Sequence, residues 1–205
     1  MTKAELIHDL RTSRAQLDAL VEGMPKDELT ARTMSGAPSV KDVLAHLAAW
    51  EAELVTALAK LKQGVRSRFF DLGDEHVDAL NATTYEENKD RPLERVMADF
   101  RGVRVQVIRQ VERFSQAELD APVSKHSGAT LTELVLGETI EHQQEHLPDL
   151  RAWRVSVGSS PGAAVVTADG GLKTEDTIPA PGELMTEDTI PAYHPRTRGT
   201  KGTDD

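Results

Sequence analysis

The sequence predicts an all-α helical bundle followed by a disordered C-terminal tail. Four long segments carry apolar residues at the 3.6-residue spacing of an amphipathic helix. Serine and threonine residues in capping positions stand where three of these segments begin. Up to residue 154, no segment has the two-residue alternation that indicates a strand. Four long helices and one shorter helix can pack around a shared core and build a site from several facing helices.

The first long helix is expected at residues 2–22. Thr2 and Glu5 form a capping box at its start, and Gly23 is a typical helix stop. Its predicted buried face consists of Leu6, Leu10, Ala15, Leu17, Leu20 and Val21. Residues 24–38 contain two prolines, a glycine and several small polar residues, and are therefore expected to be a connection.

The second long helix is expected to begin after Ser39, its cap, and to end at Gly64. Its apolar face includes Val40, Val43, Leu44, Leu47, Leu54, Val55, Leu58 and Leu61. His46 falls within this face, and Trp50 follows one turn later. Residues 65–72 show no clean period and are expected to form a loop that can cover a site.

A shorter helix at residues 74–87 and two further long helices complete the predicted bundle. Pro92 stands at the first position of the third long helix, which runs to about residue 114. Residues 115–129 are polar and contain proline and glycine, as in a connection. The last helix begins with the capping box of Thr130 and Glu133 and continues to about residue 153. Pro148 lies inside it and is expected to kink it.

The predicted domain comprises residues 1–154, and residues 155–205 are expected to be a disordered tail. Glycine, serine, proline, threonine and acidic residues replace the large apolar residues there. The peptide Thr-Glu-Asp-Thr-Ile-Pro-Ala occurs at residues 174–180 and again at 186–192. A duplicated linker and a short docking peptide both fit this repeat.

Composition limits the chemistry and the partners. The chain has no cysteine, so disulfides, thiolate metal sites and a cysteine nucleophile are excluded, and histidine and carboxylate remain as metal ligands. The N-terminus lacks the apolar region of a signal peptide, and no run of about eighteen apolar residues occurs. We therefore expect a cytoplasmic protein. The net charge of −10 argues against nucleic acid and against an anionic membrane as partners.

Three histidines form the candidate site. His142 and His146 are four residues apart, so on a helix both imidazoles can reach one metal ion. Both continue the apolar stripe of their helix, and His46 lies on the apolar face of another. Polar groups on a core face need a partner, which a shared metal ion supplies. Three imidazoles suit Zn²⁺, Ni²⁺ or Fe²⁺ about equally. The alternative is that His142 and His146 lie on a solvated helix face.

Three stretches of the sequence resemble the DinB/YfiT-like superfamily. Residues 39–51, which include His46, resemble its second-helix motif, and residues 138–147 resemble its final His-x3-His helix. Residues 81–92 are similar to a segment of the branch near the colibactin self-resistance protein family. The resemblance covers about residues 3–154. It implies an up-down-down-up four-helix bundle, often a homodimer, with a divalent metal on His46, His142 and His146. It also implies possible dependence on a low-molecular-weight thiol such as mycothiol or bacillithiol.

Our expected function is that of a metal-dependent enzyme acting on a reactive small molecule, as a hydrolase or a thiol transferase. Because the chain has no cysteine, any thiol must come from a cofactor. Glu138 is the candidate general base or the partner that orients an imidazole, and an exposed helix carboxylate is its alternative. Trp50 and Asn81 are candidates for the wall of a cofactor or substrate pocket. A non-catalytic protein of the same fold that sequesters a small molecule is the alternative function.

Overall fold

The bundle consists of four long helical segments. A computed structural model describes residues 1–31 and 39–158. Within them, α1 spans Lys3–Val21, α3 Val40–Lys62 and α5 Leu93–Glu112. The fourth segment is made of α7 (Leu131–Leu136), a π-helical turn η2 (Gly137–Glu141) and α8 (His142–Gly158). The predicted all-α class is confirmed, since the described residues form no strand and only one isolated bridge, between Pro122 and Thr130.

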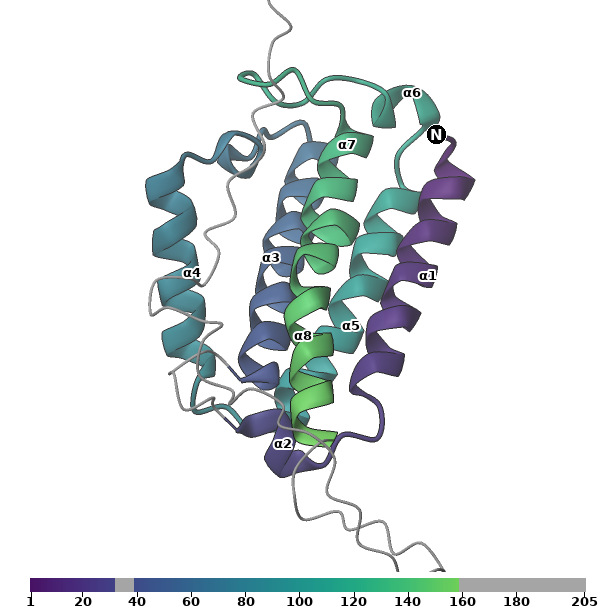
Figure 1. The fold of residues 1–205 in the computed structure, drawn as a ribbon. Helices are drawn as coiled ribbons and strands as arrows, with labels where there is room; N and C mark the ends of the chain where they lie inside the picture. Colours follow the sequence, from purple (N-terminus) through teal and green to yellow (C-terminus); the bar gives the residue numbers. More distant parts are fainter. Residues whose placement is uncertain (32–38, 159–205) are drawn as a thin grey trace, which may run out of the picture.

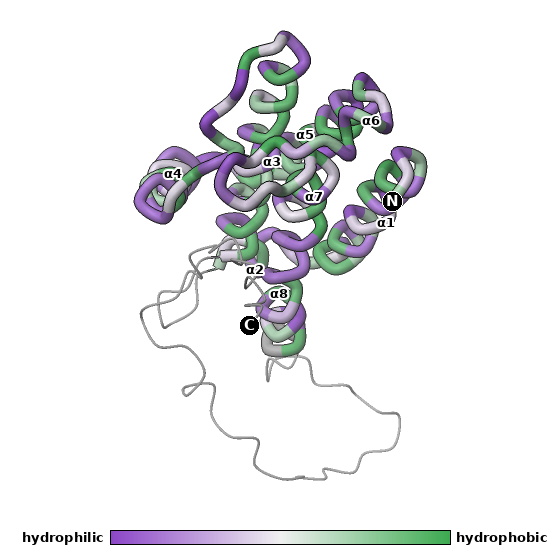
Figure 2. Tube along the Cα trace, turned by 90° about the horizontal axis from the view of Figure 1, so that it is seen from above, coloured by the Kyte–Doolittle hydropathy of each residue, from purple (hydrophilic) through white to green (hydrophobic). Residues whose placement is uncertain are grey.

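The four segments have up-down-down-up topology (Figure 1). The last segment runs in the direction of α1, and α3 and α5 both run in the opposite direction. Two consecutive parallel helices need a connection that returns along the bundle, and α4 (Asp74–Asn88) is that connection. Viewed down the bundle, α4 lies outside the four long segments, beside α3 (Figure 2).

The predicted helix starts at Thr2, Ser39 and Thr130 are confirmed. All three residues form capping boxes, in which the hydroxyl accepts from the third helical residue and that residue's carboxylate accepts from the cap N–H. Each box satisfies backbone donors that a helix start otherwise leaves unpaired. Pro92 stands one position earlier than expected, as the N-cap of α5.

Three short helical pieces lie in segments that were expected to be connections. They are α2 (Lys26–Thr30), the 3-10 turn η1 (Arg68–Asp71) and α6 (Gln116–Leu119). Local capping accounts for α6, which has its own box from Ser115 and Glu118. Acidic residues in the first turn favour α2, where Asp27 and Glu28 face the positive end of the helix dipole.

The interior contains two apolar clusters, one towards each end of the bundle. The cluster near the N-terminus of α1 includes Leu6, Leu10, Leu54, Val107 and Leu131. The other includes Leu17, Leu44, Val96, Phe100 and Leu150. Between them, each of the four long segments contributes buried polar residues. We call this the polar layer: Ser13, Arg14, His46, Glu51, Arg104, His142, Gln143 and His146.

The predicted tail lies almost entirely outside the described residues, and so do both copies of the repeated peptide. Helix α8 continues past Pro148 to Gly158, four residues beyond the expected end of the domain. In the described part of the chain, no helix combines the length and the apolar character that crossing a membrane requires.

Candidate metal centre

The structure brings the three predicted histidines together in the polar layer. His46 comes from α3, whereas His142 begins α8 and His146 follows one turn later. His142 and His146 are 1% and 7% exposed, and His46 is partly buried. One nitrogen from each ring lies within 4.8 Å of the other two. The alternative of a solvated helix face is therefore wrong, because the side chains of His142 and His146 are both buried in the bundle.

The spacing of the ring nitrogens suits a shared ion. The Nε2 atoms of His46 and His142 are 2.9 Å apart. Two nitrogens at 2.0–2.1 Å from one ion, at tetrahedral or right-angle positions, lie about 2.9–3.4 Å apart. The third nitrogen, within 4.8 Å, reaches the same spacing with a ring movement of about 1.4 Å or less. An all-nitrogen set of three ligands leaves a position for water or substrate.

Burial keeps the three imidazoles neutral. It lowers the pKa of His46 to about 3, with a smaller contribution from nearby His146. Burial also lowers the pKa of His142, and the rings of His46 and His146 add to the effect. The pKa of His146 is lowered by burial, although Asp149 acts in the opposite direction. Neutral rings are the form that binds a metal, so no proton has to be displaced near pH 7.

A network of buried charges fixes the helices around these rings. Arg104 donates from Nε and Nη2 to the two oxygens of Glu51, at 3.0 and 2.6 Å, and Arg14 donates to the same carboxylate at 2.5 Å. Arg104 also donates to Ser13 Oγ, and Gln143 donates to the carbonyl of Ser13 at 2.6 Å. The network therefore connects α1, α3 and α5 to α8 directly beside His142.

Sequence reasoning missed this network, although the chain contains a signal for it. Arg14, Glu51 and Arg104 occupy core positions of their helices, each between buried apolar residues four or three positions away. A charged residue in such a position is the same anomaly that identified His46. What the sequence does not show is that these three residues meet each other.

Trp50 and Asn81, the predicted wall residues, are joined by a hydrogen bond near the histidines. The indole N–H of Trp50 donates to Asn81 Oδ1 at 2.9 Å. The Trp50 ring lies edge-on to His142, with centroids 5.9 Å apart, and also packs against Phe69 at 6.0 Å. Trp50 of α3 therefore contacts the histidine cluster directly, whereas Asn81 of α4 is connected to it through Trp50.

Glu138 lies one turn before His142, in the π-helical turn. Its Oε2 atom is buried and has no hydrogen-bond partner among the described residues. Burial raises the pKa of Glu138 to about 8, and the charge of Glu145 adds to the shift. The carboxyl group is therefore mostly protonated at pH 7, unlike an exposed glutamate. π-Helical turns are rare and frequently occur at functional sites. This one has no signal in the apolar spacing of the helix.

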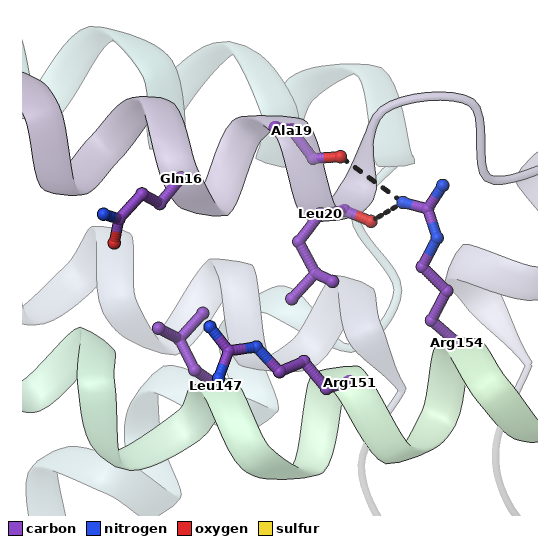
Figure 3. A pocket seen from close by; sticks show the side chains of 6 residues that line it. All are labelled: Gln16, Ala19, Leu20, Leu147, Arg151 and Arg154. Atoms are coloured by element: carbon purple, nitrogen blue, oxygen red, sulfur yellow. Dashed lines mark hydrogen bonds between the residues drawn. The ribbon is translucent and has the colours of Figure 1, made fainter.

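A separate pocket of about 550 Å³ lies between α1 and α8 (Figure 3). Its lining residues are Gln16, Ala19, Leu20, Leu147, Arg151 and Arg154. None of the three histidines lines it. Arg154 donates to the carbonyls of Ala19 and Leu20 at the end of α1, so it caps that helix.

The sequence matches the family model of the DinB superfamily over residues 9–149. No curated protein matches it. Solved structures share the fold at low identity. An uncharacterised protein from Escherichia coli UTI89 is 18% identical with a TM-score of 0.64, and the match covers 77% of this chain and 95% of that one. The sibling lethal factor precursor DfsB is 16% identical with a TM-score of 0.66, over 77% and 97% of the two chains.

A third solved structure corrects the expectation about partners. It is the colibactin self-resistance protein ClbS in complex with a dsDNA, 18% identical with a TM-score of 0.65, over 75% of this chain and 95% of that one. The exclusion of nucleic acid is therefore wrong, because a protein of this fold has been crystallised with DNA. Net charge sums over all side chains and does not describe the potential of any single face.

Proposed function

Because the chain belongs to the DinB superfamily, we propose that His46, His142 and His146 bind one divalent metal ion and that this centre acts on a reactive small molecule. The observation that carries the proposal is the approach of three neutral, inward-facing imidazoles inside a bundle. Buried polar rings on a core face cost free energy unless they have partners. A shared ion satisfies all three rings at once.

The chemistry follows from the ligand set. A bound divalent ion lowers the pKa of water or of a thiol and so supplies a nucleophile near neutral pH. The protein contributes three neutral nitrogen ligands, which suit zinc, nickel and iron alike. The chain has no cysteine, so in a thiol transferase the thiol is a separate molecule of the mycothiol or bacillithiol type. Hydrolysis needs water alone.

Glu138 is the proton-transfer group in this proposal. Its Oε2 atom is buried one turn before His142 and has a pKa raised to about 8, close to the operating pH that favours acid–base catalysis. The protonated carboxyl can donate to a leaving group, and the carboxylate can accept a proton from the nucleophile. Trp50, held by Asn81, provides an apolar wall that limits the access of water.

Sequestration without turnover is the second candidate. Its support is the structural likeness to ClbS, a self-resistance protein. Both functions use the same metal centre, so metal-binding experiments do not separate them.

Metal content tests the part that both candidates share. Protein purified without a histidine tag is expected to contain about one ion per chain by elemental analysis, and His46→Ala and His142→Ala are expected to lose it. His8→Ala, which removes an exposed histidine of α1, is the matched control and keeps its metal. Stoichiometric metal in either centre variant would refute the site.

Turnover separates the two candidates. Consumption of mycothiol or bacillithiol with 1-chloro-2,4-dinitrobenzene tests transfer, and p-nitrophenyl acetate tests hydrolysis. An enzyme accelerates one of these reactions above the rate in solution, and Glu138→Gln slows it about 10²-fold or more with unchanged metal content. A metal-loaded protein that accelerates neither reaction, but binds an electrophile stoichiometrically, supports sequestration.

A further inference from the structure

A second cleft lies between α3, the segment around η1 and α4. Its volume is about 650 Å³, within the range of small-molecule sites. Lys60 of α3 stands at one end, fourteen residues after His46. At a rise of 1.5 Å per residue, this places Lys60 about 21 Å along α3 from the histidine. Glu53, which also lines the cleft, follows His46 by seven residues, or about 10 Å along α3. None of the three histidines lines the cleft, so it is distinct from the metal centre.

The floor of the cleft is apolar. Phe69, Leu72 and Leu80 line it, and Val65 at its edge is 53% exposed. Phe69 packs on the far side against Trp50, which borders the histidines. A ligand in this cleft can bury hydrocarbon or aromatic surface, and Phe69 and Trp50 separate it from the metal centre.

The rim of the cleft is cationic, although the whole chain has a net charge of −10. Lys60, Arg66 and Arg68 line it, and Glu53 is the one acidic residue that does so. Arg66 is paired with Asp71. The side chains of Lys60 and Arg68 make no hydrogen bond or ion pair with the described residues, so both cations are available to a ligand.

Helix α4, on the opposite side of the cleft from α3, contributes no acidic residue to the lining. Asp74, Glu75 and Asp78 lie in the first two turns of α4, yet none of them lines the cleft. The lining positions of α4 are His76, Ala79, Leu80 and Thr83, which follow the three- and four-residue spacing of one helix face. The cleft thus combines an apolar floor, two unpaired cations and a facing helix surface without carboxylates.

We propose that this cleft binds a small amphipathic anion, with its acidic group between Lys60 and Arg68 and its apolar body on Phe69, Leu72 and Leu80. A carboxylate, sulfonate or phosphate group fits the two cations, since hydrogen bonds between ionised groups are the strong ones. The inference is independent of the metal centre.

A pair of matched probes tests the proposal. 8-Anilino-1-naphthalenesulfonate carries an anionic group on an apolar body, and N-phenyl-1-naphthylamine is the same aromatic body without the sulfonate. Titrations followed by probe fluorescence are made on the full chain, on Lys60→Gln/Arg68→Gln, and on Arg101→Gln/Arg109→Gln. The last variant makes the same change in net charge at exposed positions of α5.

The sulfonate probe is expected to bind wild type and the α5 variant alike, and to bind Lys60→Gln/Arg68→Gln at least about 10-fold more weakly, as loss of hydrogen bonds to a charged group implies. The uncharged probe binds all three proteins equally, and His46→Ala leaves both probes unaffected. Equal sulfonate affinity in all variants overturns the proposal. The proposal is also overturned if Lys60→Gln/Arg68→Gln binds both probes more weakly to the same extent, or if His46→Ala no longer binds the sulfonate probe.

Discussion

Glu51 forms ion pairs with two buried guanidinium groups, those of Arg14 and Arg104. Removing one partner of a buried ion pair leaves an uncompensated charge in the interior, which typically costs about 3–5 kcal/mol. We therefore expect Glu51→Gln to lower the free energy of unfolding of the metal-free protein by that amount, measured by urea denaturation.

Glu53 is the matched control for Glu51, because it is an exposed glutamate two residues further along the same helix. Glu53→Gln is expected to change the free energy of unfolding by about 0.5 kcal/mol or less. Equal effects of the two variants would show that the network does not stabilise the fold.

The raised pKa of Glu138 makes the stability of the metal-free protein depend on pH. Its pKa is raised from 4.5 to about 8 in the folded state, so between these values the folded protein binds more protons than the unfolded chain. This contribution is fully present below about pH 4.5 and is lost as pH rises through 8. Glu138→Gln should therefore lose less stability than wild type between pH 6 and 9 in thermal unfolding with a chelator present. Glu141→Gln, an exposed neighbour in the same turn, should follow wild type; a Glu138→Gln profile parallel to wild type would contradict the buried carboxyl.

At the residue scale, the sequence predicted the histidine cluster and neighbouring Trp50, but not the network of buried charges beside them. His142 and His146 could be paired because helical spacing alone places them together, and His46 because it interrupts an apolar stripe. Arg14, Glu51 and Arg104 interrupt their stripes in the same way. Their pairing depends on how three separate helices are rotated and shifted relative to one another. Apolar spacing within each helix does not show this.

At the scale of the elements, Arg154 connects the last helix to the end of the first. It donates to carbonyls at the C-terminus of α1, which has no basic residue in its own last turn (Figure 3). Arg154→Ala is expected to lower the free energy of unfolding by about 1 kcal/mol, through the lost cap and the lost cation at the negative helix end. Arg151→Ala, in the same pocket but without such bonds, should cost about 0.5 kcal/mol or less by urea denaturation. A larger loss of unfolding free energy in Arg151→Ala than in Arg154→Ala would contradict the capping role of Arg154.

The long helices could be predicted because their caps and apolar spacing agree. The short elements α2, η1 and α6 could not, since four or five residues are too few to show a period. The π-helical turn before His142 has no periodic signature either. It inserts one extra residue per turn into a stretch whose apolar spacing otherwise fits an α-helix.

At the scale of the whole molecule, the polar layer between two apolar clusters explains how one bundle can bury a cluster of three histidines. The clusters supply the burial that stabilises the fold, and the layer holds the buried polar groups from all four long segments. Net charge, in contrast, was a poor guide at this scale, because it led to the exclusion of nucleic acid that the ClbS complex overturns.

The bundle is expected to hold its metal without the C-terminal region. All three histidines and the family match, which ends at residue 149, lie before residue 158. A chain that ends at residue 158 should keep about one ion per chain and the melting temperature of the full-length protein to within about 2 °C, since no residue of either cluster is removed. Loss of metal in this shorter chain would assign the C-terminal region a part in the centre.

X-ray absorption at the metal edge tests the central claim most directly. The account predicts about three imidazole nitrogens at 2.0–2.1 Å from the ion in wild type, with the outer-shell scattering typical of imidazole rings. It also predicts that His142→Ala, reloaded with the same metal, lacks this three-imidazole signature. A wild-type spectrum with oxygen ligands only, or one that His142→Ala leaves unchanged, would contradict a centre built from His46, His142 and His146.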